Sequence, residues 1–119
     1  MRHVFTALLV LSCLTELMAA ATLIGGPDGL AAAGRGGQWS MHYGFAALAI
    51  ASLSIWAWPQ RQVLAAVTLA LGVLATFHIG LAISLAAAGD QQAGLVIHSV
   101  LAVLAVLLLT QRGKIVSTT

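Results

Sequence analysis

The chain has 119 residues, of which 61% are hydrophobic and only 7% are charged, with a formal net charge of +2. Soluble domains carry about 25% charged residues. These few charges could not cover a globular surface, so the composition predicts an integral membrane protein and excludes the large basic surface that nucleic-acid binding requires. The single cysteine, Cys13, excludes an internal disulfide and every Cys-x-x-Cys site.

Four apolar segments are long enough to cross a bilayer as helices, since roughly 20 residues at about 1.5 Å each span the hydrocarbon core. They cover residues 4–24, 39–58, 63–87 and 93–110. The connecting segments contain the glycines, prolines and polar residues that end helices, as in GGPDG, WPQRQ and GDQQAG. The sequence thus predicts an all-α integral membrane protein, with a four-transmembrane-helix bundle forming a single membrane domain over residues 1–119.

The first of these segments has a second interpretation. A basic residue, an apolar stretch and an alanine-rich end resemble a secretory signal peptide, and cleavage would remove residues 1–21. The apolar run continues to Ile24, however, whereas the apolar core of a signal peptide is about 7–15 residues long. We therefore expect a membrane span here, and the role of Glu16 discussed below depends on this residue being retained.

Basic residues in the short flanking segments predict the direction of the chain, because Lys and Arg in such segments stay cytoplasmic. Arg2, Arg61, Arg112 and Lys114 flank one side of the predicted bundle, and only Arg35 lies on the other side. Both termini are therefore expected on the cytoplasmic side. For a compact chain rich in alanine and glycine, with no eukaryotic targeting signal, we expect a multi-pass protein of the bacterial inner (cell) membrane.

The third span carries small residues at a strict spacing of four. Gly72, Thr76, Gly80 and Ser84 lie on one ridge of a helix, which lets a second helix approach closely. We expect this ridge to be a helix-packing surface, either within the bundle or between copies in a homo-oligomer or a larger membrane complex. The other expected partner is the lipid bilayer, and no nucleic-acid partner is expected.

Two segments of the chain resemble each other. LAAAGRGGQWSMH at residues 30–42 and LAAAGDQQAGLVIH at residues 85–98 both begin with LAAAG and end with histidine, and the second is one residue longer. In both cases alanines follow the final histidine at the fourth and seventh positions. A duplication would give two repeated helical hairpins related by an axis along the membrane normal. Alanine-rich helices also resemble one another without duplication, so both explanations stay open.

Each predicted span contains one ionisable residue, and these are Glu16, His42, His78 and His98. An ionised side chain at mid-membrane costs about 2.5–3.5 kcal/mol on insertion scales, so such residues face the bundle interior and mark function. Counted along the helices from the ends of the spans, all four lie in the outer half of the bilayer. Glu16 and His78 lie deeper than His42 and His98, and the sequence leaves open whether the four converge on one site.

These residue types suit a metal site. Neutral imidazoles are the commonest metal ligands, and Glu16, His42, His78 and His98 could together hold zinc, copper or iron. One inward ligand per helix is an established way to build such a site in a four-helix bundle. Histidines on neighbouring helices could instead ligate a haem b on both faces. We therefore predict a small membrane protein that binds a metal ion or haem near its outer face.

Other functions fit the same residues. In a proton-coupled transporter of small molecules or cations, Glu16 would exchange protons against the substrate. The length, the four spans and this glutamate resemble the small multidrug resistance family, although the aromatic residues of that family's second and third spans have no counterpart here. In an enzyme, Glu16 and a histidine would act as general base and acid on a lipid-soluble substrate or a quinone. In a non-catalytic accessory membrane subunit, the histidines would only hydrogen-bond across helices.

Overall fold

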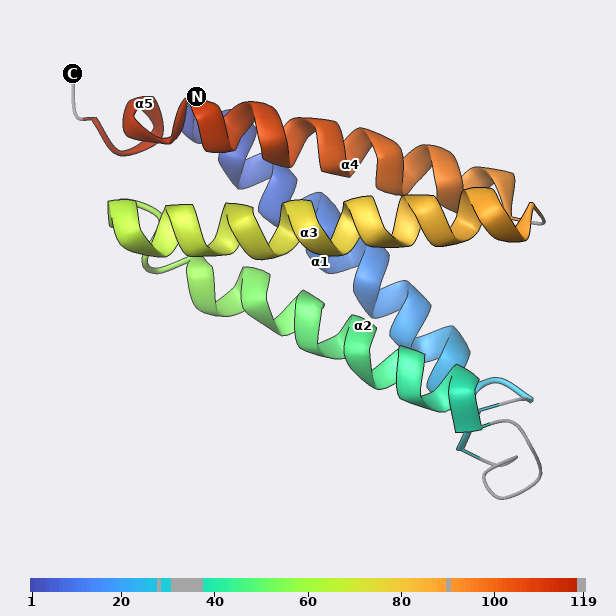
Figure 1. Ribbon diagram of the computed structural model, residues 1–119. Helices are drawn as coiled ribbons and strands as arrows, with labels where there is room; N and C mark the ends of the chain where they lie inside the picture. Colours follow the sequence, from blue (N-terminus) through green and yellow to red (C-terminus); the bar gives the residue numbers. More distant parts are fainter. Residues whose placement is uncertain (28, 31–37, 90, 118–119) are drawn as a thin grey trace. The chain divides into compact units, whose positions relative to one another are not determined.

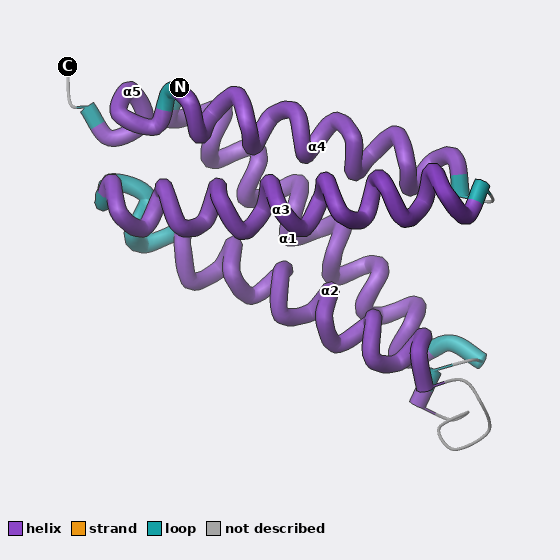
Figure 2. Tube along the Cα trace, viewed as in Figure 1, coloured by secondary structure: helices purple, strands orange, loops and turns teal. Residues whose placement is uncertain are grey.

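The computed structural model describes residues 1–27, 29–30, 38–89 and 91–117. In this part of the chain every regular element is a helix and there is no strand, as Figure 2 shows. Four of the helices are long and apolar enough to cross a membrane, so the predicted all-α fold with four candidate spans is confirmed. The direction across the membrane and the single membrane domain stay predictions. So does the duplication, whose first copy includes residues 31–37, outside the described residues.

The helices follow one another in chain order (Figure 1). Their bounds are α1 Arg2–Gly25, α2 Gln38–Ala57, α3 Leu64–Ala88, α4 Gln92–Thr110 and α5 Arg112–Val116. The first four match the predicted spans to within two residues at each end. The sequence does not predict α5, because its five residues, RGKIV, include a glycine and two basic side chains and show no apolar period.

The two ends of α3 are set by local backbone chemistry. After α3 the backbone of Gly89 takes a left-handed conformation with φ 76°, and its N–H donates to the carbonyl of Leu85 at 3.0 Å. A residue with a Cβ adopts this conformation only at a cost, so glycine is the usual stop for a helix. Before α3 the chain turns at Pro59, and the N–H of Val63 donates to the carbonyl of Gln60 at 2.8 Å. These two stops set the residues at which α3 begins and ends.

The chain divides into two compact units. Unit 1 contains Met1–Leu8 and Ala57–Thr119, and thus the start of α1 together with α3, α4 and α5. Unit 2 is Leu9–Trp56, and it contains the rest of α1 and nearly all of α2. The histidines of the third and fourth spans therefore belong to unit 1, whereas Glu16 and His42 belong to unit 2.

Helices α3 and α4 pack against each other as an antiparallel pair in unit 1 (Figure 1). Their buried side chains recur every three or four residues, which is the period of one helix face. The buried residues are Val67, Ala70, Leu71, Leu74, Ala75 and His78 on α3, and His98, Leu101, Ala102, Ala105 and Leu108 on α4. Each histidine thus occupies a position on the buried face of its own helix.

The outer faces of α3 and α4 carry large apolar side chains. Leu69, Ile83 and Val96 are 66%, 65% and 61% exposed. A protein in water rarely exposes so much apolar surface, whereas the acyl chains of a bilayer are as apolar as these side chains. Together with the four apolar helices, this exposure indicates a membrane protein.

In unit 2, α1 and α2 approach each other closely at Gly44. A Cβ at this position would lie 2.7 Å from Cγ1 of Ile24 and 3.1 Å from Cβ of Leu23. Both distances are shorter than ordinary carbon–carbon contacts of about 3.5–4.0 Å, so only glycine leaves enough room here. The buried face of α2 continues from Gly44 through Ala47 and Ala51.

Candidate metal site

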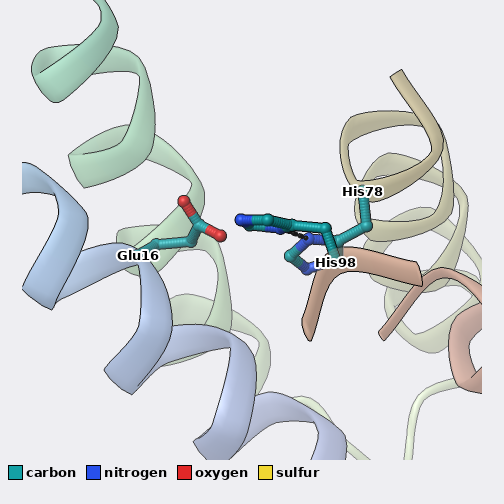
Figure 3. Close-up of side chains that lie close together, drawn as sticks. All are labelled: Glu16, His78 and His98. Carbon is teal, nitrogen blue, oxygen red and sulfur yellow. Dashed lines mark hydrogen bonds between the residues drawn. The ribbon is translucent and has the colours of Figure 1, made fainter. Parts of the chain in front are cut away.

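Two buried histidines of unit 1 contact each other directly. His78 of α3 and His98 of α4 are 0% and 6% exposed, and their Nδ1 atoms lie 2.9 Å apart. The ring centroids are 5.2 Å apart, and the ring planes are tilted by 31°. Figure 3 shows this contact as a dashed line. The two imidazoles therefore lie side by side within the α3–α4 pair.

The contact requires the two rings to hold different tautomers. A neutral imidazole carries one N–H and one lone pair, so one Nδ1 donates and the other Nδ1 accepts. The donating ring then has a lone pair on its Nε2, and the accepting ring has an N–H there. The two rings thus share one proton between their Nδ1 atoms. Of their two Nε2 atoms, one is a hydrogen-bond donor and the other is an acceptor.

Phe77 packs against both imidazoles. Its ring meets that of His78 at a centroid distance of 5.3 Å and an angle of 73°, and that of His98 at 6.4 Å and 76°. Edge-to-face contacts of this kind are a favoured arrangement of ring pairs. Phe77 therefore restricts the orientation of both histidine rings at once.

Glu16 is fully buried on α1, in unit 2. It stands one turn after Ser12 and one turn before Ala20, which are also buried, so the three share one helix face. Figure 3 draws Glu16 together with the two histidines, and all three side chains are of types that bind metal ions.

His42 has a different environment. It is exposed on α2, and its ring meets the ring of Trp39 edge-on, with centroids 6.2 Å apart and planes at 80°. Ala46 and Ala49, which follow it on the same stripe, are exposed as well. Each helical residue turns by about 100°, so the buried Ala47 points roughly 140° away from His42. His42 is thus exposed where the sequence predicts that it faces the bundle interior. Its metal-ligand role stays a prediction.

The ridge of small residues on α3 is open in the described part of the chain. Thr76, Gly80 and Ser84 are exposed, and Gly72 is partly exposed. A Cβ at Gly72 or Gly80 would meet no described atom within 4 Å. Helix packing on this ridge therefore stays a prediction, and a partner helix would find room there.

Sequence patterns miss one member of the candidate site. Glu16, His78 and His98 stand out because they are ionisable residues inside apolar segments. Phe77 carries no such signal, since one more aromatic ring in an apolar helix is ordinary. In the sequence, only its position next to His78 connects it with the site. Its contact with His98 depends on how α3 and α4 pack.

No protein-family model, no curated protein and no solved structure matches the chain.

Proposed function

We propose that this chain is a multi-pass membrane protein that binds one transition-metal ion (zinc, copper or iron) through His78, His98 and Glu16. The observation that carries the proposal is the contact between the two buried imidazoles, whose Nδ1 atoms lie 2.9 Å apart. Polar side chains inside a membrane are costly and are kept where they function. Imidazole and carboxylate are also ligands that all three metals accept.

The spacing of the two Nδ1 atoms suits ligands of a single ion. A metal–imidazole bond is about 2.0–2.1 Å long, so two such bonds at roughly 90–110° hold their nitrogens about 2.9–3.4 Å apart. The 2.9 Å between the Nδ1 atoms lies at the short end of that range. Loading the site would require only small side-chain rotations, with both ring protons on Nε2 so that both Nδ1 atoms offer lone pairs.

The same spacing argues against a haem held between the two rings. Nitrogens on opposite faces of one iron would be roughly 4 Å apart, with the iron and the porphyrin between them. His78 and His98 instead touch at Nδ1, 2.9 Å apart. A single ion bound from one side fits this arrangement better than a bis-histidine haem.

Glu16 is proposed as the third ligand on grounds of charge and depth. A carboxylate would offset part of the charge of the ion, which is costly to bury alone. Glu16 lies nine residues before the end of α1 and His78 ten residues before the end of α3, roughly 13–15 Å at the helical rise. His98 lies six residues after the start of α4, or roughly 9 Å. If the spans end at a common membrane surface, these counts place Glu16 close to His78 in depth and His98 about one helical turn nearer the surface.

The proposed location is the bacterial inner membrane, with both termini in the cytoplasm and the metal group nearer the outer face. The support is the charge bias, with Arg2, Arg61, Arg112 and Lys114 on one side and Arg35 on the other. A homo-oligomer or a larger membrane complex, joined through the open ridge on α3, is part of the same proposal.

Metal content of the purified protein tests the proposal. Detergent-solubilised protein is incubated separately with Zn²⁺, Cu²⁺ and Fe²⁺, desalted, and analysed by inductively coupled plasma mass spectrometry. We expect close to one ion per chain in the wild type, and less than roughly a tenth of that in His78→Ala and His98→Ala. His3→Ala is the matched control, because it removes an exposed imidazole from α1 that no proposed site includes.

Two outcomes would contradict the proposal. Equal metal contents in the wild type and in both histidine variants would show that the metal binds elsewhere. An absorption spectrum with a Soret band that disappears in His78→Ala would replace the single ion by a haem.

A proton-coupled carrier is the second candidate, because His78 and His98 already share one proton between their Nδ1 atoms. In that function Glu16 and the pair would take up and release protons as the substrate crosses. Proteoliposomes with a pH-sensitive dye distinguish the two candidates. Proton flux that needs Glu16, in protein that binds no metal, would favour the carrier.

A further inference from the structure

One end of unit 1 is strongly basic. Arg112 and Lys114 lie on α5, and Nε of Arg2 donates to the carbonyl of Ile115 on the same helix at 3.3 Å. Arg61 lies just before the start of α3, and α3 contacts α5. Four of the five basic residues of the chain therefore gather where the first and the last helix meet (Figure 1).

The described residues of unit 1 include no aspartate or glutamate. The chain has three acidic residues: Glu16 lies in the middle of α1, Asp28 follows α1, and Asp90 lies in the segment that joins α3 to α4. The hydrogen bonds of the basic side chains go to neutral oxygens instead. Arg61 donates to the carbonyl of Trp58 at 2.8 Å, and Arg112 donates to the carbonyl of Leu109 at 2.9 Å. Within the described residues of unit 1, no acidic side chain therefore balances this positive charge.

The basic side chains retain donors for an anion. A guanidinium has five N–H groups, and the bond of Arg61 or Arg112 to a carbonyl uses one of them. The exposed ammonium of Lys114 makes one long contact of 3.4 Å with Oε1 of Gln111. Arginine N–H groups match phosphate oxygens in geometry as well as in charge. A phosphate group is therefore the natural ligand for this end of unit 1.

Trp58 indicates the depth of this basic end. The guanidinium of Arg61 lies over its ring, 5.2 Å from the centroid, and the ring is 41% exposed. Tryptophan is enriched at the level of the lipid headgroups, where one side of the ring is apolar and the other wet. At that level the phosphates within reach belong to phospholipids.

We propose that Arg2, Arg61, Arg112 and Lys114 form a binding site for the phosphate headgroup of an anionic phospholipid. The site is separate from the Glu/His group and does not depend on a metal. Each Lys or Arg near an anionic membrane surface strengthens binding by about fivefold. The site prefers an anionic headgroup over a zwitterionic one of equal chain length, because only the anionic headgroup leaves a net charge to neutralise.

Native mass spectrometry of the detergent-solubilised protein tests the site. Dioleoyl phosphatidylglycerol and dioleoyl phosphatidylcholine are titrated in parallel, and the bound fractions are compared. We expect phosphatidylglycerol to bind at least several-fold more tightly, and the double variant Arg112→Gln/Lys114→Gln to bind the two lipids about equally. Arg35→Gln is the matched control, since it removes one positive charge that the sequence places between α1 and α2.

Three results would overturn the proposal. Equal binding of the two lipids in the wild type would show that no anionic headgroup is selected. Equal losses in Arg35→Gln and in Arg61→Gln would show an effect of net charge alone. Complete displacement of phosphatidylglycerol by excess inorganic phosphate would assign the site to a free anion. Far-UV circular dichroism establishes first that each variant is folded, and Arg61→Gln tests the site without altering α5.

Discussion

The Nδ1 atom of His78 lies 2.9 Å from the Nδ1 atom of His98, and the two residues lie on the buried faces of α3 and α4. Twenty residues separate the two histidines in the sequence, and no spacing motif links them. They meet because the chain turns back after the glycine stop at Gly89, so that both positions fall on the shared face. The packing of α3 against α4 thus brings two histidines that are distant in the sequence into direct contact.

Loss of one imidazole should destabilise the metal-free protein. In His98→Ala the Nδ1 of His78 loses its hydrogen bond in a buried position, which costs about 1–3 kcal/mol. Unfolding in mixed detergent, followed by circular dichroism, measures this change. His42→Ala, which alters an exposed ring, should change the free energy of unfolding by less than about 0.5 kcal/mol. Equal effects of the two variants would contradict the structural role of the pair.

Phe77 should strengthen metal binding by orienting the two histidine rings, although it is not a metal ligand itself. Edge-to-face ring contacts contribute about 0.5–1.5 kcal/mol, so Phe77→Leu is expected to weaken metal binding by about two- to tenfold. Phe77→Tyr keeps the ring and should restore most of the affinity. The visible spectrum of bound Cu²⁺ reports ligand orientation, and it should shift in Phe77→Leu but not in Phe77→Tyr. A purely structural role would leave this spectrum unchanged in both variants.

Two glycines should respond in opposite ways to a larger side chain. A Cβ at Gly44 would lie 2.7 Å from Cγ1 of Ile24, whereas a Cβ at Gly80 meets no described atom within 4 Å. Gly44→Leu should therefore destabilise the protein by about 1–3 kcal/mol or more through overpacking. Gly80→Leu should leave thermal stability almost unchanged. If the ridge joins two copies, Gly80→Leu will also lower the oligomer mass in light scattering, while an unchanged oligomer would remove the ridge from the interface.

Metal should stabilise the folded protein by an amount that rises with the free metal concentration. At a free concentration of about 100 Kd, a ligand that binds only the folded state adds about 2.7 kcal/mol. We expect a rise in the unfolding midpoint on addition of the bound metal, with no rise in His78→Ala and a reduced rise in Glu16→Gln. A rise of equal size in His78→Ala would show that the metal acts through another site.

The sequence predicts the helices well because bilayer thickness makes length and hydropathy sufficient. The four long helices appear where apolar runs of adequate length occur, and their ends follow local signals such as Pro59 and Gly89. Helix α5 lies beyond these signals. It is a short basic turn after Thr110 that no apolar pattern marks.

The site is harder to predict, because depth along a helix does not determine direction around it. Glu16, His78 and His98 extend buried stripes of their own helices, and the sequence identifies all three. His42 lies at a suitable depth, yet the close approach of α1 at Gly44 makes another face of α2 the buried one. Which face of an apolar helix is buried depends on packing, and uniformly apolar faces give little indication of it.

The ligands of the bound metal are the most direct test of the central claim. X-ray absorption spectroscopy of the metal-loaded protein gives the number and type of first-sphere ligands. We predict two imidazole nitrogens at about 2.0–2.1 Å with one or more oxygen ligands, and the loss of one imidazole in weakly loaded His98→Ala. A spectrum with only oxygen scatterers, or one that is the same in His98→Ala, would contradict a metal site built on the His78–His98 pair.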